Sequence, residues 1–171
     1  MARNWTLQFE PKAMDTGSPA VGASPSFLTT TLRPSVAFDA ATDESAVLEG
    51  IIPSEHTGSG TLKLYLLYAS STTTAANVWR IDIAGEARSP DNTETADADS
   101  YATNETAVDA TFSTTAYSLE STTITLANFK SGESPTAGDK FRVKITRDAN
   151  HANDDLAADC HLLGAELYEE V

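Results

Sequence analysis

Apolar and polar residues alternate along much of the chain, which is the pattern of β-strands with one buried face. The clearest case lies near the C-terminus, where Phe141, Val143 and Ile145 alternate with basic and polar residues. The same criterion predicts strands within residues 5–9, 36–38, 46–52, 61–70, 77–84, 122–129, 138–148 and 160–168. In residues 77–84, Trp79, Ile81 and Ile83 are predicted to share the buried face.

Polar segments rich in glycine and proline separate these predicted strands. Residues 54–60, Ser-Glu-His-Thr-Gly-Ser-Gly, are typical of a turn. About eight short strands at such spacings favour an all-β fold, an antiparallel β-sandwich of jelly-roll type. A chain of 171 residues suits one such domain, so residues 1–171 are predicted to form a single β-sandwich.

Two stretches do not fit the strand pattern. Residues 11–25 are rich in Gly, Ser, Pro and Ala and are predicted to form an extended arm or loop. Residues 88–109 are acidic and rich in Thr and Ala, and we expect a long excursion between strands. A short helix and an edge strand both remain open within that excursion.

Composition excludes several classes of partner. A formal net charge of −14 makes direct attachment to nucleic acid or to anionic lipid improbable. The longest apolar stretch, residues 64–69, is far shorter than the roughly 20 residues of a membrane span, and we expect no signal peptide. The single cysteine, Cys160, permits no internal disulfide and suits synthesis in a reducing cytoplasm.

Two groups of side chains are candidate metal ligands. An acidic group within residues 91–99 has the oxygen donors that Ca²⁺ prefers, but it lacks the glycine and the final glutamate of an EF-hand loop. Its members are Asp91, Glu94, Asp97 and Asp99. The second group has no paired ligands at zinc spacing. It consists of His151, Asp154, Asp155, Asp159, Cys160 and His161. We expect a solvated loop in the first case and no metal or cofactor in either.

Nucleophilic catalysis has no organised signature in the chain. Gly-x-Ser-x-Gly is missing, and the Gly58-Ser59-Gly60 segment lacks the strand-turn-helix context of a nucleophile elbow. Cys160 and His161 are adjacent in a predicted strand, so their side chains are expected to point to opposite faces. The sequence therefore predicts a protein that is not an enzyme, with no catalytic residues.

Basic residues recur at polar positions of the predicted strands, at Lys63, Arg80, Arg142 and Lys144. If these strands share a sheet, the four residues would form a face able to dock on an acidic partner. The alternative is an ordinary solvated sheet face.

Several short motifs of the chain resemble a family of small bacteriophage virion proteins with a jelly-roll-like sandwich. The matching residues are Pro53 with Gly60-Thr61-Leu62-Lys63-Leu64-Tyr65, Asn77-Val78-Trp79, Gly138-Asp139-Lys140-Phe141-Arg142-Val143, Arg147-Asp148, Asn153-Asp154-Asp155-Leu156-Ala157 and Leu162-Leu163-Gly164-Ala165-Glu166-Leu167. The resemblance spans residues 51–168. The family's usual Asp-Thr-Leu is Asp154-Asp155-Leu156 in this chain.

This resemblance implies a structural component of a phage virion. We expect a capsid cement or decoration protein on the head surface, a homotrimer whose partner is the major capsid protein. The alternative is a tail-fibre or head-fibre module that binds host-surface carbohydrate. In that case an aromatic residue would stack on sugar rings, with Trp79, Tyr65, Tyr68 and Tyr101 as candidates.

Overall fold

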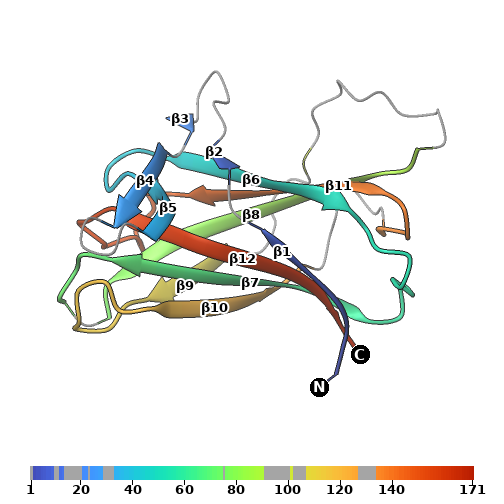
Figure 1. Ribbon diagram of the computed structural model, residues 1–171. Coiled ribbons are helices and arrows are strands. Elements are labelled where there is room, and N and C mark those ends of the chain that lie inside the picture. Colours follow the sequence, from blue (N-terminus) through green and yellow to red (C-terminus); the bar gives the residue numbers. More distant parts are fainter. Residues whose placement is uncertain are drawn as a thin grey trace.

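The computed structural model describes residues 2–9, 12–13, 21–22, 24–28, 33–74, 76–90, 101, 107–126 and 134–171. These residues form twelve strands (Figure 1). The strands are β1 (Arg3–Phe9), β2 (Lys12–Ala13), β3 (Val21–Gly22), β4 (Ser24–Leu28), β5 (Arg33–Phe38), β6 (Glu44–Ile51), β7 (Thr61–Ser70), β8 (Val78–Arg88), β9 (Ala107–Thr111), β10 (Glu120–Thr125), β11 (Lys140–Arg147) and β12 (Cys160–Glu170). Within the described part of the chain, no helix is long and apolar enough to cross a membrane.

The strands form two sheets packed face to face, named here after their central strands. The β12 sheet has the order β10-β7-β12-β5-β4, and β1 also pairs with β12. The β11 sheet has the order β2-β6-β11-β8-β9, and the short β3 pairs with β6. From β5 to β12, successive strands lie in opposite sheets, except that β8 and β9 are neighbours in the β11 sheet; this is the arrangement of an eight-stranded jelly roll. The predicted antiparallel β-sandwich of jelly-roll type is confirmed.

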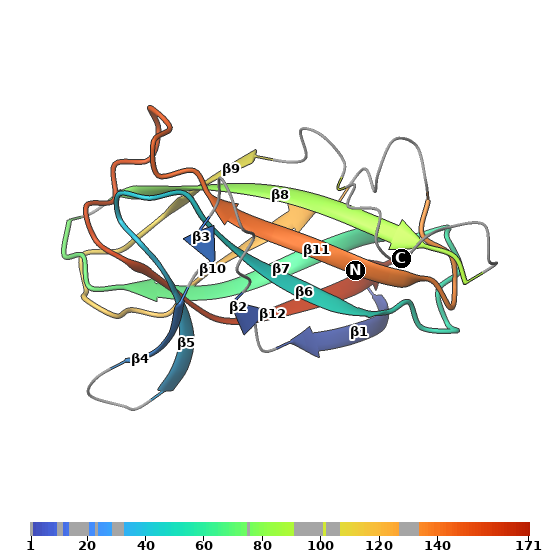
Figure 2. The same ribbon diagram turned by 90° about the horizontal axis from the view of Figure 1, so that it is seen from above.

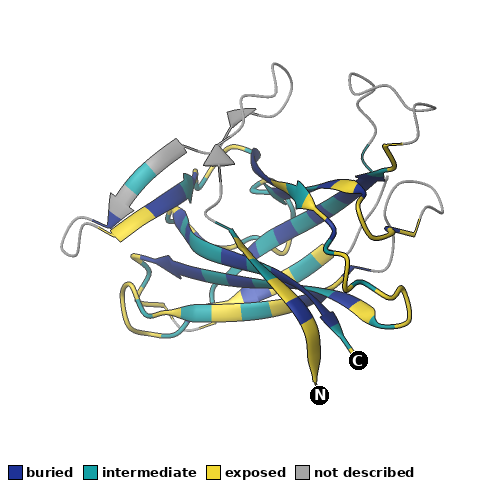
Figure 3. Ribbon diagram, turned by 45° about the vertical axis from the view of Figure 1, so that its right-hand side comes forward, coloured by how far each residue is buried: buried dark blue, intermediate teal, exposed yellow. Residues whose placement is uncertain are grey.

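The core lies between the two sheets and follows the alternation seen in the sequence. Phe141, Val143 and Ile145 of β11 are fully buried, and Trp79 of β8 packs edge to face on Phe38 of β5. Figure 3 shows buried residues alternating with more exposed ones along the long strands. Burial of this apolar surface is the main driving force for the sandwich.

The structure differs from the predicted strands at several places. Strand β9 (Ala107–Thr111) overlaps the C-terminal end of the predicted acidic excursion 88–109 and forms an edge of the β11 sheet, which is one of the two alternatives left open for that segment. The strand predicted at residues 36–38 begins earlier, at Arg33, so that Pro34 is the second residue of β5, which is paired with β4. Parts of the predicted arm 11–25 form β2, β3 and the start of β4; the rest of the arm lies outside the described residues.

The two chain ends lie side by side at one end of the sandwich (Figure 1). The Val171 amide donates a hydrogen bond to the Ala2 carbonyl, 3.0 Å away. At the opposite end of β12, the β4–β5 hairpin extends away from the body of the two sheets (Figure 2). The outer face of the β12 sheet extends between the paired chain ends and the β4–β5 hairpin.

Candidate functional site

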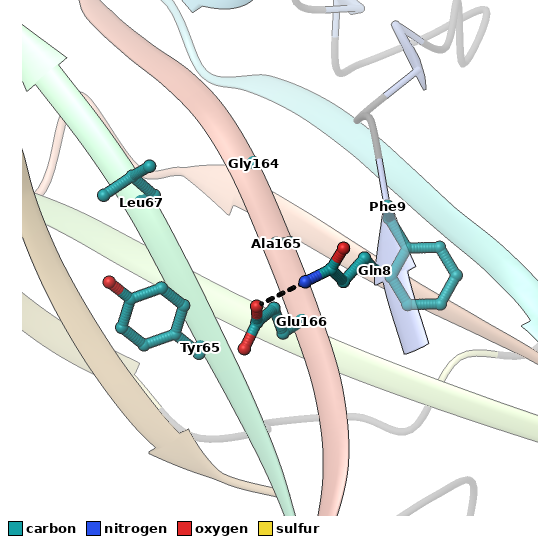
Figure 4. Close-up of a pocket in the computed structure, with 7 residues that line it drawn as sticks. All are labelled: Gln8, Phe9, Tyr65, Leu67, Gly164, Ala165 and Glu166. Carbon is teal, nitrogen blue, oxygen red and sulfur yellow. Dashed lines mark hydrogen bonds between the residues drawn. The ribbon is translucent and has the colours of Figure 1, made fainter. Parts of the chain in front are cut away.

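A pocket of about 270 Å³ opens on the outer face of the β12 sheet (Figure 4). Three strands contribute to it: β1, β7 and β12. Its lining residues are Gln8, Phe9, Tyr65, Leu67, Gly164, Ala165 and Glu166. In Figure 4, Tyr65 and Leu67 stand on β7 while Gln8 reaches from β1 towards Glu166 of β12.

Strand register brings these distant residues together. Gln8 lies opposite Glu166 in the β1–β12 pair, and Glu166 lies opposite Tyr65 in the β12–β7 pair. Residues directly opposite one another in antiparallel strands have neighbouring side chains on the same face. The three side chains therefore form one row across the sheet. Leu67 is two residues from Tyr65 and faces the same way.

A β-bulge in β12 sets which side chains reach this face. The pairing with β7 passes from Leu162–Tyr68 to Gly164–Leu67, so Leu163 is an extra residue. An extra residue reverses the phase of the side chains that follow it. Leu162 before the bulge is buried in the core, whereas Gly164 and Glu166 after it lie on the outer face.

Glu166 is held in place by two neighbours on β1. Its Oε1 accepts a hydrogen bond from Gln8 Nε2 at 3.0 Å, and its Oε2 accepts one from Arg3 Nη1 at 2.8 Å. The Arg3 guanidinium also lies over the ring of Tyr168, 4.0 Å from its centroid. Because Arg3 balances Glu166, this wall of the pocket is polar but carries no net charge.

Away from this pocket, one buried cation organises the loop that precedes β12. Arg147 is fully buried and donates two hydrogen bonds to Asp154, from Nε at 3.0 Å and from Nη2 at 2.8 Å. Its remaining hydrogen bonds go to the carbonyls of Leu156, Ala158 and Phe38. We call these groups the Arg147 cluster. Because every nitrogen of the guanidinium donates hydrogen bonds, the cost of burying its charge is offset.

A buried anion plays the same part at the other end of β12. Glu169 is fully buried and accepts hydrogen bonds from side chains and backbone amides of β1 and residues 57–60. The donors are Asn4 Nδ2, Trp5 Nε1, Thr57 N, Thr57 Oγ1 and Gly60 N. Burial works to raise the pKa of Glu169, but the hydrogen bonds from Asn4, Gly60 and Thr57 outweigh it and hold the pKa at about 2. We call these groups the Glu169 cluster.

The four basic residues of the predicted docking face do not share a sheet. Lys63 lies on β7 of the β12 sheet, whereas Arg80, Arg142 and Lys144 lie on β8 and β11 of the β11 sheet. The prediction of one common face is therefore wrong for Lys63, because strand order cannot be read from alternation within a strand. The other three do share the outer face of the β11 sheet, since their neighbours in sequence are the core residues.

Those three basic side chains have acidic or aromatic neighbours. Arg142 Nε donates to Glu86 at 2.9 Å, and Arg80 Nη1 donates to Asp109 at 2.8 Å. The Lys144 ammonium lies 5.0 Å from the centre of the Tyr101 ring. Glu86 is almost fully buried and also pairs with Arg88. Each of these three cations therefore has a partner within the chain, a carboxylate for Arg80 and Arg142 and an aromatic ring for Lys144.

The candidate metal ligands Asp154 and Asp155 make hydrogen bonds within the fold. Asp154 belongs to the Arg147 cluster, and Asp155 Oδ1 accepts a hydrogen bond from the Val78 amide at 2.6 Å. Among the described residues, no group of three or more His, Cys, Asp and Glu side chains is placed to hold a metal ion. The acidic group Asp91, Glu94, Asp97 and Asp99 lies outside the described residues.

Cys160 and His161 point to opposite faces, as the alternation predicts. Cys160 is fully buried, and burial raises the pKa of its thiol well above the ordinary value, which disfavours the thiolate. His161 is half-buried on the outer face, where its Nδ1 lies 3.2 Å from the Ser35 hydroxyl. The two side chains do not form a dyad.

The four aromatic candidates for sugar stacking have different surroundings. Trp79 and Tyr68 are in the core, where their rings are 5.3 Å apart. Tyr101 lies against Arg142 and Lys144. Only Tyr65 among the four lines the pocket.

Sequence reasoning missed the polar wall of the pocket. Gln8 and Glu166 are 158 residues apart in the chain, and only strand pairing places them together. A local signal existed in Leu162-Leu163-Gly164, where two consecutive leucines and a glycine interrupt the alternation of the last strand. Such an interruption indicates a bulge.

Comparison with known proteins identifies no sequence family: neither a protein-family model nor a curated protein sequence matches the chain. Among solved structures, a family 11 carbohydrate-binding module from Clostridium thermocellum, in complex with a mixed-linked tetrasaccharide, is similar over 95% of this chain and 86% of its own. Its TM-score is 0.44 and its sequence identity 14%. An arabinose-bound α-L-arabinofuranosidase is similar with a TM-score of 0.45 and 12% identity. The match covers 95% of this chain but only 23% of the arabinofuranosidase. These are distant likenesses in backbone, and neither brings a ligand or an activity to this chain.

Proposed function

We propose that the chain is a non-enzymatic structural protein of a bacteriophage virion, a decoration protein that stabilises the head by bridging capsid subunits. One observation carries the proposal. The C-terminal residues that resemble the phage virion family supply the buried framework of the fold: Arg147, Asp154 and Leu156 all belong to the Arg147 cluster. The motif thus has a structural role, as expected for a protein that works as a rigid part.

The mechanism of such a protein is mechanical. The Arg147 and Glu169 clusters tie loops to the two ends of β12, so that the sandwich would act as a stiff body at a junction between capsid subunits. Tyr117 and Leu119, exposed on the loop between β9 and β10, offer apolar contact area for a neighbour. Each contact would be weak, and many copies on one shell would act together. The partner is the major capsid protein, and the decorating unit a homotrimer.

Quantitative mass spectrometry of purified virions tests this proposal. We expect a copy number comparable with that of the major capsid protein, or about a third of it, as repeated decoration of a symmetric shell requires. A copy number of only a few per cent would move the protein to a tail or fibre. Complete absence from washed virions would contradict any virion role.

The second candidate is a fibre module that binds host-surface carbohydrate. One specific observation favours it: Tyr65 lines an outward-opening pocket together with Glu166 and Gln8. A tyrosine beside a carboxylate and an amide is a combination suited to polar ligands that have an apolar face. The two candidates are compatible, since a head fibre would be both a virion component and a sugar binder.

A further inference from the structure

From the pocket on the outer face of the β12 sheet, we propose that this site binds one neutral pyranose ring of a glycan. The inference deepens the second candidate function and rests on it. It is carried by the juxtaposition of a tyrosine ring, an ion-paired carboxylate and a side-chain amide around a glycine floor.

The apolar wall of the pocket is made by Tyr65 and Leu67 on β7. Both side chains are half-buried on the outer face of the sheet, where polar residues are the usual occupants. A pyranose has one face of C–H bonds that packs on an aromatic ring, while its hydroxyls project from the edge. The Tyr65 ring offers such a surface, and its hydroxyl offers a donor and an acceptor at the rim.

The opposite wall supplies hydrogen bonds for the hydroxyl edge. Each oxygen of Glu166 accepts one bond from β1, and a carboxylate has about four acceptor positions, so acceptor capacity remains for ligand hydroxyls. The Gln8 amide adds a second N–H and a carbonyl oxygen beside it. Hydrogen-bond donors and acceptors thus lie side by side on this wall. They suit the hydroxyl groups of a sugar, because each hydroxyl can both donate and accept a hydrogen bond.

Charge selects among hydroxylated ligands. Arg3 pairs with Glu166 at 2.8 Å, so the site has no unbalanced negative charge to attract a cation. The formal net charge of −14 repels acidic glycans. A neutral sugar satisfies both conditions.

The size of the pocket suits a single sugar ring. Its volume of about 270 Å³ is just below the range of roughly 300–1,000 Å³ usual for drug-sized ligands. Gly164 keeps the floor open, since a Cβ placed there would meet no atom within 4 Å. A side chain at this position would project into space that the ligand needs.

An apolar side chain from another protein is a poorer occupant. It would fill the space beside Tyr65 and Leu67 but would leave the remaining acceptors of Glu166 and the Gln8 amide without partners, which costs free energy. The polar wall therefore favours a ligand with hydroxyls.

The test is a titration of the full-length ¹⁵N-labelled protein with glucose, galactose, mannose and N-acetylglucosamine, followed by amide chemical shifts. We expect at least one sugar to shift the amides of Gln8, Gly164 and Glu166, with the millimolar affinity usual for a single small ring. If none of the four shifts these amides at about 50 mM, more than tenfold above such a dissociation constant, the proposal is overturned.

Two variants and one control separate the pocket from the rest of the surface. Tyr65→Leu removes the stacking ring, and Gly164→Val fills the floor while suiting a strand; each should weaken binding about tenfold or more. Tyr117→Leu makes the same change at an exposed tyrosine outside the pocket and should leave the affinity unchanged. Equal sugar affinity in the wild type and Gly164→Val, with unchanged melting temperatures, would overturn the assignment.

A second probe tests the charge argument, and the virion measurement stays independent. Tetramethylammonium chloride should not shift the pocket amides; if it binds there more tightly than every sugar, the site is a cation site and the proposal fails.

Absence of sugar binding in a protein present at high copy number on virions would remove the sugar site alone. Sugar binding by a protein absent from virions would remove the virion role alone.

Discussion

Two fully buried charged residues hold the ends of the last strand, and they do so by opposite means. Arg147 uses its donors on a carboxylate and on backbone carbonyls, whereas Glu169 uses its acceptors on side chains and backbone amides. Burying either charge without its partners would cost several kcal/mol. Each cluster is therefore most sensitive to the loss of a single member.

Replacing Arg147 should be among the most destabilising single changes in the protein. Arg147→Met leaves Asp154 buried without its main partner and should lower the free energy of unfolding by about 3–5 kcal/mol. Adding Asp154→Asn should cost much less in that variant than in the wild type, because the pair acts as a unit. Urea denaturation of the four proteins measures this coupling.

Arg80→Met is the matched control for that experiment. Arg80 pairs with Asp82 and Asp109 at the surface, where an ion pair contributes about 1 kcal/mol or less. Equal losses at positions 80 and 147 would contradict the structural role assigned to the Arg147 cluster.

Glu169 should make stability depend on pH in the acid range. Its pKa is about 2 in the folded protein and near the ordinary value of 4.5 when unfolded. Between these values the unfolded state binds more protons, so stability falls as the pH is lowered from 4.5 to 2. Glu169→Gln should cost about 3 kcal/mol at neutral pH, and the difference from wild type should shrink across that window.

Thermal unfolding at several pH values measures the effect, with Glu170→Gln as the control. Glu170 is the next residue, but it is partly exposed and lies 3.7 Å from Lys63, so its loss should change stability by at most about 0.5 kcal/mol. A constant difference between wild type and Glu169→Gln from neutral pH down to pH 2 would show that the carboxylate is not what stabilises this cluster.

At the scale of elements, two glycines have opposite surroundings, one just before β7 and the other within β12. A Cβ on Gly60 would lie 2.5 Å from Glu169 Cγ and 2.7 Å from the Glu170 carbonyl oxygen, so this glycine makes room for the Glu169 cluster. Gly164, just after the bulge in β12, has open space where its Cβ would be. The first glycine serves folding, and the second leaves the pocket open.

Alanine substitutions distinguish the two roles. Gly60→Ala forces the backbone of β12 to shift and should destabilise the protein by about 1–3 kcal/mol. Gly164→Ala should change stability by about 0.5 kcal/mol or less, because nothing has to move. Urea denaturation midpoints compare them directly, and a larger loss for Gly164→Ala would refute this account.

How far the sequence predicts these elements depends on whether the signal is local. Strand 61–70 is found where alternation places it, because each inward leucine is two residues from the next. Strand β9 was hidden in an acidic, Thr-rich segment, since an edge strand needs few apolar residues. The pocket lay beyond reach because Gln8, Tyr65 and Glu166 meet only through the register of three strands.

At the scale of the whole molecule, strong negative charge acts against self-association. The formal net charge is −14, and the acidic side chains of neighbouring copies would repel each other at low ionic strength. Repulsion keeps free copies apart, whereas a capsid surface would concentrate them. The proposed trimer must therefore overcome a penalty that salt can reduce.

Ionic strength should accordingly control the assembly state of the isolated protein. At about 20 mM NaCl the Debye length exceeds 20 Å and repulsion is strong; at about 300 mM it falls below 10 Å. We expect light scattering to report a mass near 18.1 kDa at low salt and a rise towards three times that mass at high salt and high protein concentration. Leu119→Asp, which removes an exposed apolar contact, should suppress the rise if that loop lies in the trimer interface. A mass of one chain under all conditions would contradict trimer formation in solution. In that case copies could associate only once they are bound to the capsid surface.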